Sequence, residues 1–270
     1  MKAITSAENR WVKLAAALQR RKMRYKEHRF MTEGFRMLEE LVALKYMDVV
    51  CFVNETGRTS DRFAALYENS QALAWEWYEV TESVYQKMKS TEHSQGVLAM
   101  VPFEEKKYVD IPTEKTGMYL YLHDIQDPGN LGTIIRTAAA SGCLGILLSP
   151  GSVDVFNEKV VRSTMGNLFR LPVVQQVSPE EMLAFARQRN AAVIACAMEG
   201  AVCYTEPAYE AGAVVVLGNE GNGLPQDLIE ACDCCAAIPM ADGVESLNVA
   251  VAASLFLYEG FRKKNFINKK

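Results

Sequence analysis

Residues 214–225 read Val214-Val215-Val216-Leu217-Gly218-Asn219-Glu220-Gly221-Asn222-Gly223-Leu224-Pro225, an apolar run that passes directly into a loop with three glycines. An uninterrupted apolar run is typical of a strand in a parallel sheet that helices cover on both faces. Similar runs lie at 118–122, 144–148, 193–198, 213–217 and 236–240. Stretches with helical periodicity separate them, at about 131–141, 157–168, 178–190 and 225–231. The second half of the chain is therefore predicted to be an α/β domain with a parallel sheet, closed by an apolar helix over 248–264.

The first hundred residues alternate between shorter helices and strands, which predicts a small α/β domain. Its first element is predicted to be an amphipathic helix over 6–27, with Ser6 as the N-cap, because apolar residues recur there at helical spacing. Residues 103–116 are charged, contain a proline and show no period, which indicates a linker. We therefore expect one domain over 1–102 and a second over 117–270.

The composition excludes several classes of protein. The chain has 270 residues, of which 49% are hydrophobic and 23% are charged, so it is not intrinsically disordered. No apolar run approaches the roughly 20 residues of a membrane span, and the start of the chain has no signal sequence, so we expect a cytoplasmic protein. Seven cysteines form no regular framework, which favours a reducing compartment. We interpret Cys232, Cys234 and Cys235 as packing residues and expect no metal site.

Charge is distributed unevenly along the chain. Residues 1–36 carry ten Lys and Arg against three acids, whereas the whole chain has a net charge of −4. Such a basic end on an acidic protein is typical of a surface that binds a polyanion, although a solvated helix would have the same composition. On the first reading, Arg20, Arg21 and Arg24 are the candidate RNA-binding residues.

Three loops follow predicted strands and carry unusual polar residues. Ligands of parallel sheets bind at these carboxyl ends. In 123–138, Arg136 is the one charged residue of an apolar helix and needs either an anion or a buried carboxylate as its partner. In 214–225, the glycine spacing matches neither the dinucleotide-binding nor the Walker fingerprint, and Glu220 argues against a phosphate. In 238–252, Ser246 and Asn248 precede the last helix, either as caps or as hydrogen-bonding groups of a pocket.

Taken together, these loops resemble the SpoU (TrmH-type) RNA ribose 2′-O-methyltransferases of the SPOUT superfamily. The resemblance lies in Asp127-Pro128-Gly129-Asn130-Leu131-Gly132 with Arg136-Thr137-Ala138, in 217–224, and in Ile238-Pro239-Met240 through 246–250. Less specifically, 30–34 and 91–99 resemble the family's N-terminal substrate-binding domain. Asn219 stands where many relatives have serine.

The resemblance implies S-adenosylmethionine as the methyl donor, a trefoil knot in the C-terminal domain, and a homodimer with active sites near the subunit interface. It implies a ribose 2′-hydroxyl of ribosomal RNA as the substrate, with transfer RNA as the alternative. The implied catalytic residues are Arg136, Asn130, Glu220, Ser246 and Asn248. The implied cofactor-binding residues are Leu217, Gly218, Asn219, Gly221, Ile238, Met240, Ser246 and Leu247. A base N-methyltransferase and a catalytically silent RNA-binding protein remain as alternatives.

Overall fold

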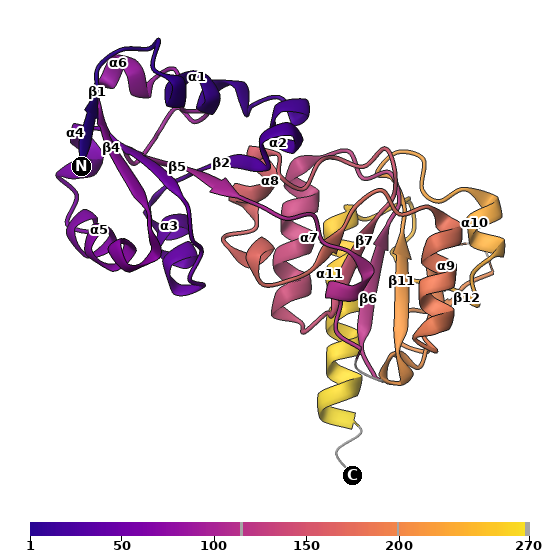
Figure 1. Ribbon diagram of the computed structural model, residues 1–270. Helices are drawn as coiled ribbons and strands as arrows, with labels where there is room; N and C mark the ends of the chain where they lie inside the picture. Colours follow the sequence, from indigo (N-terminus) through magenta and orange to yellow (C-terminus); the bar gives the residue numbers. More distant parts are fainter. Residues whose placement is uncertain (114–115, 199, 268–270) are drawn as a thin grey trace. The chain divides into compact units, whose positions relative to one another are not determined.

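The computed structural model describes residues 1–113, 116–198 and 200–267. It divides the chain into two compact units (Figure 1). Unit 1 consists of Met1–Glu104 together with Phe156–Phe169, and unit 2 consists of Glu105–Val155 together with Arg170–Lys270. Among the described residues, no helix is both long enough and apolar enough to span a bilayer.

Unit 1 is built on a five-stranded mixed sheet. Its strands are β1 (Lys2–Ile4), β2 (Arg29–Glu33), β3 (Val50–Val53), β4 (Glu76–Val80) and β5 (Val97–Pro102), in the order β1-β4-β3-β5-β2. β5 runs antiparallel to both of its neighbours, and the other pairs are parallel. Apolar side chains are buried on both faces of this sheet, as in the pair Phe30 and Met31, which belong to two different core clusters.

The helices of unit 1 are short. They are α1 (Arg10–Ala17), α2 (Arg21–Glu27), α3 (Phe35–Ala43), α4 (Glu55–Arg58), α5 (Phe63–Ser70), α6 (Glu82–Tyr85) and α8 (Glu158–Ser163). The single helix predicted over 6–27 is wrong, because the chain breaks between α1 and α2. Asn9, not Ser6, caps α1, since its side chain accepts a hydrogen bond from the backbone N–H of Trp11 at 2.9 Å. Side-chain periodicity continues through the break and does not reveal it.

The segment 156–169 joins unit 1 through aromatic packing, a placement that the predicted division at 103–116 did not include. The ring of Phe156 stacks on that of Phe103 with centroids 3.8 Å apart, and on that of Phe30 at 5.3 Å. Val161 of α8 is fully buried in the same cluster.

Unit 2 contains the predicted parallel sheet. Its strands are β6 (Met118–Leu122), β7 (Gly145–Leu148), β8 (Val173–Val174), β9 (Ala192–Cys196), β10 (Val202–Cys203), β11 (Ala213–Leu217) and β12 (Cys234–Ala237). They lie in the order β10-β12-β9-β11-β6-β7-β8, and every neighbouring pair is parallel. Four of the five predicted apolar runs form strands at nearly the predicted residues. The run at 236–240 only overlaps its strand, because β12 begins at Cys234 and ends at Ala237. The two-residue strands β8 and β10 have no sequence signal long enough to predict them.

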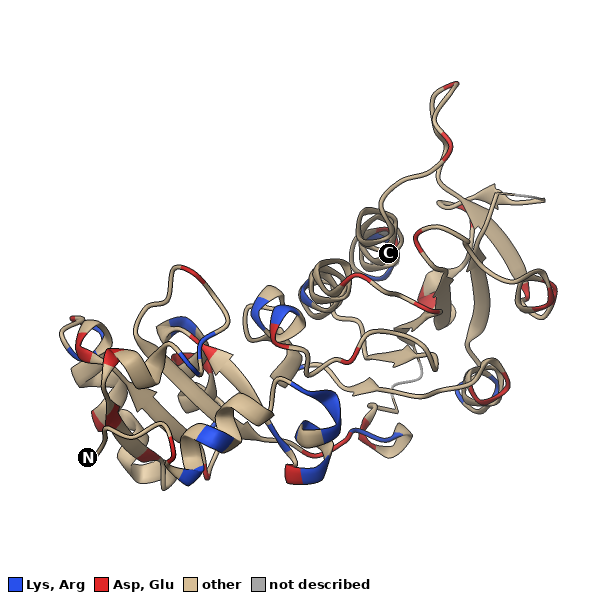
Figure 2. Cartoon of the chain, turned by 90° about the horizontal axis from the view of Figure 1, so that it is seen from above, with Lys and Arg blue, Asp and Glu red and all other residues tan. Residues whose placement is uncertain are grey.

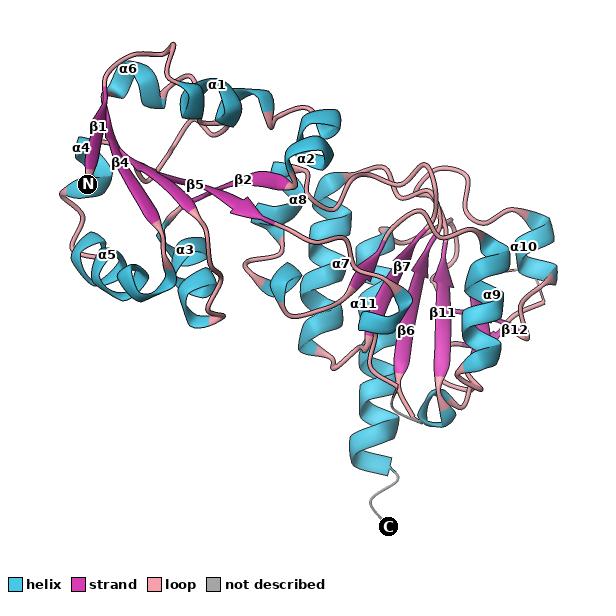
Figure 3. Ribbon diagram, in the orientation of Figure 1, coloured by secondary structure: helices cyan, strands magenta, loops and turns pink. Residues whose placement is uncertain are grey.

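Helices cover both faces of this sheet, as the continuous apolar strands predicted. They are α7 (Pro128–Ala140), α9 (Pro179–Gln188), α10 (Gln226–Glu230) and α11 (Val249–Arg262). α7 and α11 lie together on one face and α9 and α10 on the other (Figure 3). Short turns complete the described chain: η1 (Gln71–Leu73), η2 (Tyr108–Asp110), η3 (Asn167–Phe169), η4 (Tyr209–Ala211) and the π-helical η5 (Lys263–Ile267). The trefoil knot stays a prediction.

Candidate active site

The three polar loops of unit 2 follow the carboxyl ends of β6, β11 and β12. β6 and β11 are direct neighbours, with Leu122 opposite Leu217. The backbone N–H of His123 donates to the carbonyl of Leu217 at 2.8 Å, so the first two loops leave the sheet side by side. β12 lies on the other side of β9 from β11.

A chain of hydrogen bonds joins one residue from each loop. The Nδ2 of Asn248 donates to the Oδ1 of Asn130 at 2.9 Å, and the Nδ2 of Asn130 donates to Oε1 of Glu220 at 3.0 Å. The structure therefore brings together three of the predicted catalytic residues, and the two hydrogen bonds join positions 118 and 90 residues apart in sequence. Because each amide both accepts and donates, the chain fixes the orientation of all three side chains.

Glu220 also accepts hydrogen bonds from the backbone. The N–H groups of Gln126 and Asp127 donate to its two carboxylate oxygens at 3.4 and 3.3 Å. Partial burial alone would raise the pKa of Glu220, but the donors from Asn130 and from the backbone outweigh it and lower the pKa below its ordinary value. Glu220 is therefore a carboxylate at neutral pH and acts as a hydrogen-bond acceptor.

Asp127 and Asn248 begin the two helices that meet this site. The Oδ1 of Asp127 accepts from the N–H of Asn130 at 2.8 Å, with Pro128 in the first helical position. Asn130 lies within the first turn of α7, and Asp127 is the cap, so the helix begins earlier than the predicted 131. The signal was present in the sequence, since Asp before Pro is a strong helix start. Asn248 caps α11 by accepting from the N–H of Ala250 at 2.9 Å, so its side chain serves both as cap and as site residue.

Asn219 holds the glycine loop in shape. Its Oδ1 accepts from the N–H groups of Gly221 and Asn222 at 2.8 and 3.1 Å, and its Nδ2 donates to the carbonyl of Asp124 at 2.8 Å. A serine hydroxyl is shorter than the asparagine amide and offers one donor at most. Asparagine in place of serine at position 219 thus links the loop after β11 to the loop after β6.

Gly218 is required by the loop itself. A Cβ at this position would lie 2.3 Å from the carbonyl group of Gly223. The backbone of Gly223 therefore takes up the space that a side chain at this position would need. A Cβ on Gly221 would meet Asn219 at 3.5 Å, an ordinary contact, so nothing in the loop requires that glycine.

The predicted cofactor-binding residues line the ends of β11 and β12. Leu217 is buried, Ile238 and Met240 are partly buried, and Leu247 is exposed. The backbone N–H of Met240 has no hydrogen-bond partner within the described residues. Apolar side chains beside an unpaired backbone donor fit the adenosyl group of S-adenosylmethionine, whose flat base has an apolar face and a polar edge.

Ser246 is not part of the hydrogen-bond chain. It is exposed, and its hydroxyl makes no hydrogen bond to any residue that the structure describes.

Arg136 lies in the third turn of α7 and is exposed. α7 turns this position toward solvent, while Ile134, Ile135 and Ala138 are buried. Its guanidinium has no hydrogen bond or ion pair in the described parts of the chain, so the alternative of a buried pair with a carboxylate does not hold.

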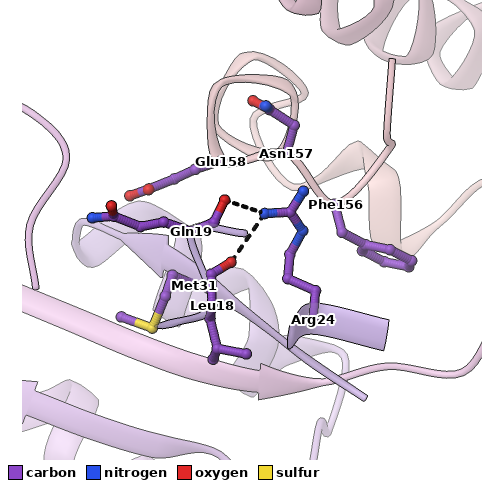
Figure 4. A pocket seen from close by; sticks show the side chains of 7 residues that line it. All are labelled: Leu18, Gln19, Arg24, Met31, Phe156, Asn157 and Glu158. Carbon is purple, nitrogen blue, oxygen red and sulfur yellow. Dashed lines mark hydrogen bonds between the residues drawn. The ribbon is translucent and has the colours of Figure 1, made fainter. Parts of the chain in front are cut away.

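The basic residues of α2 divide into two groups. Arg20, which is the N-cap of α2, and Arg21 are exposed. Figure 2 marks the Lys and Arg positions along the chain in blue. Arg24 is only 5% exposed, and its Nη1 donates to the carbonyls of Leu18 and Gln19 at 3.0 and 2.9 Å (Figure 4). Arg24 was predicted to contact RNA, but it instead fixes the turn between α1 and α2.

The cysteines are free thiols, and the described residues contain no group of three or more His, Cys, Asp or Glu side chains that could hold a metal ion. Burial raises the pKa of Cys232 to about 12 and also raises that of Cys234. Both are therefore protonated thiols at neutral pH.

Two family models match the chain. Residues 117–258 match the SpoU rRNA Methylase family, and residues 9–99 match the MRM3-like substrate binding domain. The match to the SpoU model includes all three loops of the site.

Curated relatives match over nearly the whole chain. An uncharacterized tRNA/rRNA methyltransferase of Synechocystis sp. is 34% identical over 97% of this chain and 94% of its own length. The 23S rRNA (guanosine(2553)-2′-O)-methyltransferase RlmP of Bacillus subtilis is 33% identical over 96% of this chain and 98% of its own length.

Solved structures match as well. The AdoMet-bound rRNA methyltransferase from Sinorhizobium meliloti superposes with a TM-score of 0.87, at 30% identity and over 98% of both chains. The SpoU methyltransferase AviRb from Streptomyces viridochromogenes, in complex with AdoMet, gives a TM-score of 0.87 at 25% identity, over 97% of this chain and 100% of its own. The chain therefore belongs to the SpoU family of rRNA methylases.

Proposed function

We propose that this protein transfers a methyl group from S-adenosylmethionine to a ribose 2′-hydroxyl of RNA. The observation that carries the proposal is the hydrogen-bond chain from Asn248 through Asn130 to Glu220, in the unit whose helix α7 also carries the exposed Arg136. These are the positions at which the sequence matches the methyltransferase family, and the structure joins three of them although they lie on separate loops.

The reaction forms a C–O bond and breaks a C–S bond, which releases S-adenosylhomocysteine, and the proton of the hydroxyl passes to water. S-adenosylmethionine, when bound, supplies the methyl group on a positively charged sulfur. Leu217, Ile238 and Met240 would hold its adenosyl part at the ends of β11 and β12, with Gly218, Asn219, Gly221 and Leu247 as the other candidate contacts.

Arg136 would act on the ribose. Its guanidinium stays protonated, so it can bind the phosphate beside the target ribose and donate a hydrogen bond to the 2′ oxygen as negative charge develops there. A preorganised donor of this kind contributes roughly 3–4 kcal/mol to a transition state. Asn130, Glu220 and Asn248 would orient the ribose, and exposed Ser246 is available as a further contact.

We also propose that the enzyme is a homodimer. Val244, Leu247, Val251 and Tyr258 are 38–49% exposed. Val251 and Tyr258 lie two turns apart on one side of α11, and Val244 and Leu247 lie in the loop just before this helix. This side adjoins α7, since Ser254 donates to the Thr137 hydroxyl at 3.4 Å. An exposed apolar stripe beside the helix of Arg136 is suited to a second copy of the chain, which would exclude water from the site.

The proposed substrate is ribosomal RNA, with transfer RNA as the alternative, and the proposed compartment is the cytoplasm. Support comes from the curated relative from Bacillus subtilis, which is named for a 2′-O-methylation of 23S rRNA. Unit 1 would bind the RNA, with Arg20 and Arg21 contacting phosphates. Its similarity to a substrate-binding family model supports this role.

One experiment tests the reaction. The full-length protein is incubated with S-adenosylmethionine carrying a labelled methyl group and with ribosomal RNA from cells that lack it, and the RNA is digested to nucleosides. We expect label on a 2′-O-methylated nucleoside. Label on a base would show a base N-methyltransferase, and no label with intact RNA binding would show a silent RNA-binding protein.

A further inference from the structure

Asp124 has an unusual backbone conformation in the loop that joins β6 to α7. Its φ is 54°, in the left-handed region that residues other than glycine adopt rarely and that aspartate and asparagine tolerate best. Apart from glycines, no other residue of the three loops of the site has a positive φ, and these loops are described throughout. Such conformations persist only where the surrounding structure holds them, and they gather at functional sites.

The loops after β7 and β11, the two neighbours of β6, hold the backbone of Asp124 and Ile125. The N–H of Asp124 donates to the Oγ of Ser149 at 2.8 Å, and its carbonyl accepts from the Nδ2 of Asn219 at 2.8 Å. The N–H of Ile125 donates to the Oγ of Ser152 at 3.2 Å, and its carbonyl accepts from a backbone N–H of the loop after β7 at 2.8 Å. Both serines are buried. All four backbone groups are therefore hydrogen-bonded, which fixes the turn.

The carboxylate of Asp124 is fixed as well. Its Oδ1 accepts from the Nε2 of Gln126 at 2.6 Å, and the same Nε2 donates to the carbonyl of Gly151 at 2.9 Å. A Cβ on Gly151 would lie 2.8 Å from this Oδ1, so the glycine leaves room for the carboxylate. The side chain of Asp124 thus helps to determine where Gln126 lies.

This turn places two hydrogen-bond donors of the site. The backbone N–H groups of Gln126 and Asp127, directly after the turn, donate to the two carboxylate oxygens of Glu220. They are among the hydrogen bonds that lower the pKa of Glu220. An N–H group has a fixed direction in its peptide plane, so a change of φ at Asp124 would turn both donors away from Glu220.

We infer that Asp124 is a positioning residue for methyl transfer, because it holds the turn that directs two backbone N–H groups at Glu220. It acts through Glu220 and Asn130, which are themselves hydrogen-bonded. The inference rests on the proposed function to the extent that these two residues orient the ribose. It adds a requirement for a side chain outside the set of residues proposed to contact the ribose or the cofactor.

Three substitutions separate the backbone conformation from the carboxylate. Asp124→Asn keeps an acceptor oxygen and tolerates a positive φ, Asp124→Gly keeps only the tolerance, and Asp124→Ala keeps neither. We expect the alanine variant to lower kcat for methyl transfer to ribosomal RNA by roughly 10- to 100-fold, the effect of a misplaced reacting group. The KM for RNA should stay near its wild-type value, because the proposed phosphate contacts do not involve this turn.

The other two variants should rank in a defined order. Asp124→Asn should retain most of the wild-type rate, and Asp124→Gly should fall between the asparagine and alanine variants. A wild-type kcat in Asp124→Ala, or an equal loss in all three variants, would overturn the inference.

The titration of Glu220 measures the positioning without methyl transfer. Carboxyl-carbon NMR of protein labelled in glutamate follows this group, and Glu220→Gln assigns its signal. Loss of the backbone donors should raise the pKa of Glu220 in Asp124→Ala and in Asp124→Gly. Removal of the Asp124 charge alone would lower this pKa, because a nearby negative charge is lost, and Asp124→Asn measures that effect.

If the pKa of Glu220 in the alanine and glycine variants equals that in Asp124→Asn, the inference is wrong. The glycine variant decides the point where the alanine variant does not fold.

Asn190→Ala is the matched control. Asn190 also has a left-handed backbone, with a φ of 50°, but it precedes β9 at the amino ends of the strands, away from the loops of the site. We expect this variant to lose stability while kcat and the pKa of Glu220 stay at their wild-type values. A raised pKa of Glu220 in the control would show a general loosening of unit 2 and would overturn the inference.

The two readouts also distinguish this inference from the proposed function. If the wild type transfers no methyl group to ribosomal RNA, the proposed function fails, whereas the titration still decides whether Asp124 positions Glu220. If the wild type transfers methyl groups and the titration does not respond to Asp124, the inference alone fails.

Discussion

At the scale of single residues, the exposure of Arg136 changes what its removal should do. An exposed arginine without a partner stabilises the fold little, so Arg136→Ala should unfold at nearly the wild-type temperature. We expect methyl transfer to fall at least 100-fold, from the roughly 3 kcal/mol of a lost oxyanion donor. Affinity for S-adenosylmethionine should change by a few-fold at most, since the loops that would bind it follow other strands.

Arg136→Lys tests whether methyl transfer needs only the positive charge at this position or also the planar guanidinium group. A lysine keeps the charge but lacks the planar fork that can hold phosphate and oxygen together, so rescue should be incomplete. Single-turnover rates on ribosomal RNA measure both variants. A wild-type rate in a folded Arg136→Ala protein would show that this arginine takes no part in the chemistry.

The contribution of Glu220 to the free energy of unfolding should decrease as the pH falls. Because hydrogen bonds lower its folded-state pKa, its contribution to stability is complete above the unfolded pKa of about 4.3 and is lost as the pH falls through the lowered folded value. Urea unfolding of the wild type and of Glu220→Gln should differ by a constant amount near neutral pH, and the difference should shrink in acid. A difference that grows in acid would contradict the hydrogen bonds described for this carboxylate.

At the scale of elements, the loop after β11 contains one glycine that its conformation requires, Gly218, and one that it does not, Gly221. Gly218→Ala should distort the loop, because its Cβ would lie 2.3 Å from the carbonyl group of Gly223, and should weaken S-adenosylmethionine binding by at least tenfold. Gly221→Ala should leave the melting temperature unchanged, because its Cβ has room. Calorimetric titration of both variants therefore shows whether Gly221 also faces the cofactor. Wild-type binding by Gly218→Ala would exclude this loop from the cofactor site.

In the α1–α2 segment, we expect substitutions of the exposed arginines to weaken RNA binding and a substitution of the buried Arg24 to lower stability. Replacing Arg20 and Arg21 by Gln should reduce the slope of log affinity for RNA against log salt by roughly 0.7–0.9 per lost phosphate contact, with the melting temperature unchanged. Arg24→Gln should instead lower the melting temperature, because it leaves the carbonyls of Leu18 and Gln19 without their donor. If the slope of the double variant matched the wild type, the exposed arginines would be a solvated surface.

Elements with long apolar runs could be predicted from the sequence, and elements held by distant contacts could not. The five strands around the site were visible because burial on both faces leaves a continuous pattern. The break between α1 and α2 was not, since the side chain of Arg24 makes it. Asn130, Glu220 and Asn248 were identified through family resemblance, but only the folded loops show that they share hydrogen bonds.

At the scale of the whole molecule, the apolar stripe on α11 should determine the assembly state. Val251→Glu would place a charge in the middle of the proposed contact, and we expect a monomer by analytical ultracentrifugation, with methyl transfer strongly reduced. Val109→Glu is the matched control, since Val109 is 83% exposed and lies far from α11 in sequence. A dimer that persists in Val251→Glu, or a monomeric wild type, would contradict the proposed interface.

The late arrival of Phe156 has a consequence for synthesis on the ribosome. The first 104 residues leave the exit tunnel with Phe30 and Phe103 still lacking the ring that stacks on them. At about 5–20 residues per second, translation of 105–169 takes roughly 3–13 s. During that interval the nascent chain exposes an aromatic surface, so it offers a chaperone a binding site that disappears once residue 169 emerges. Slowing translation within 105–155 should therefore lower the soluble yield more than slowing it after residue 169.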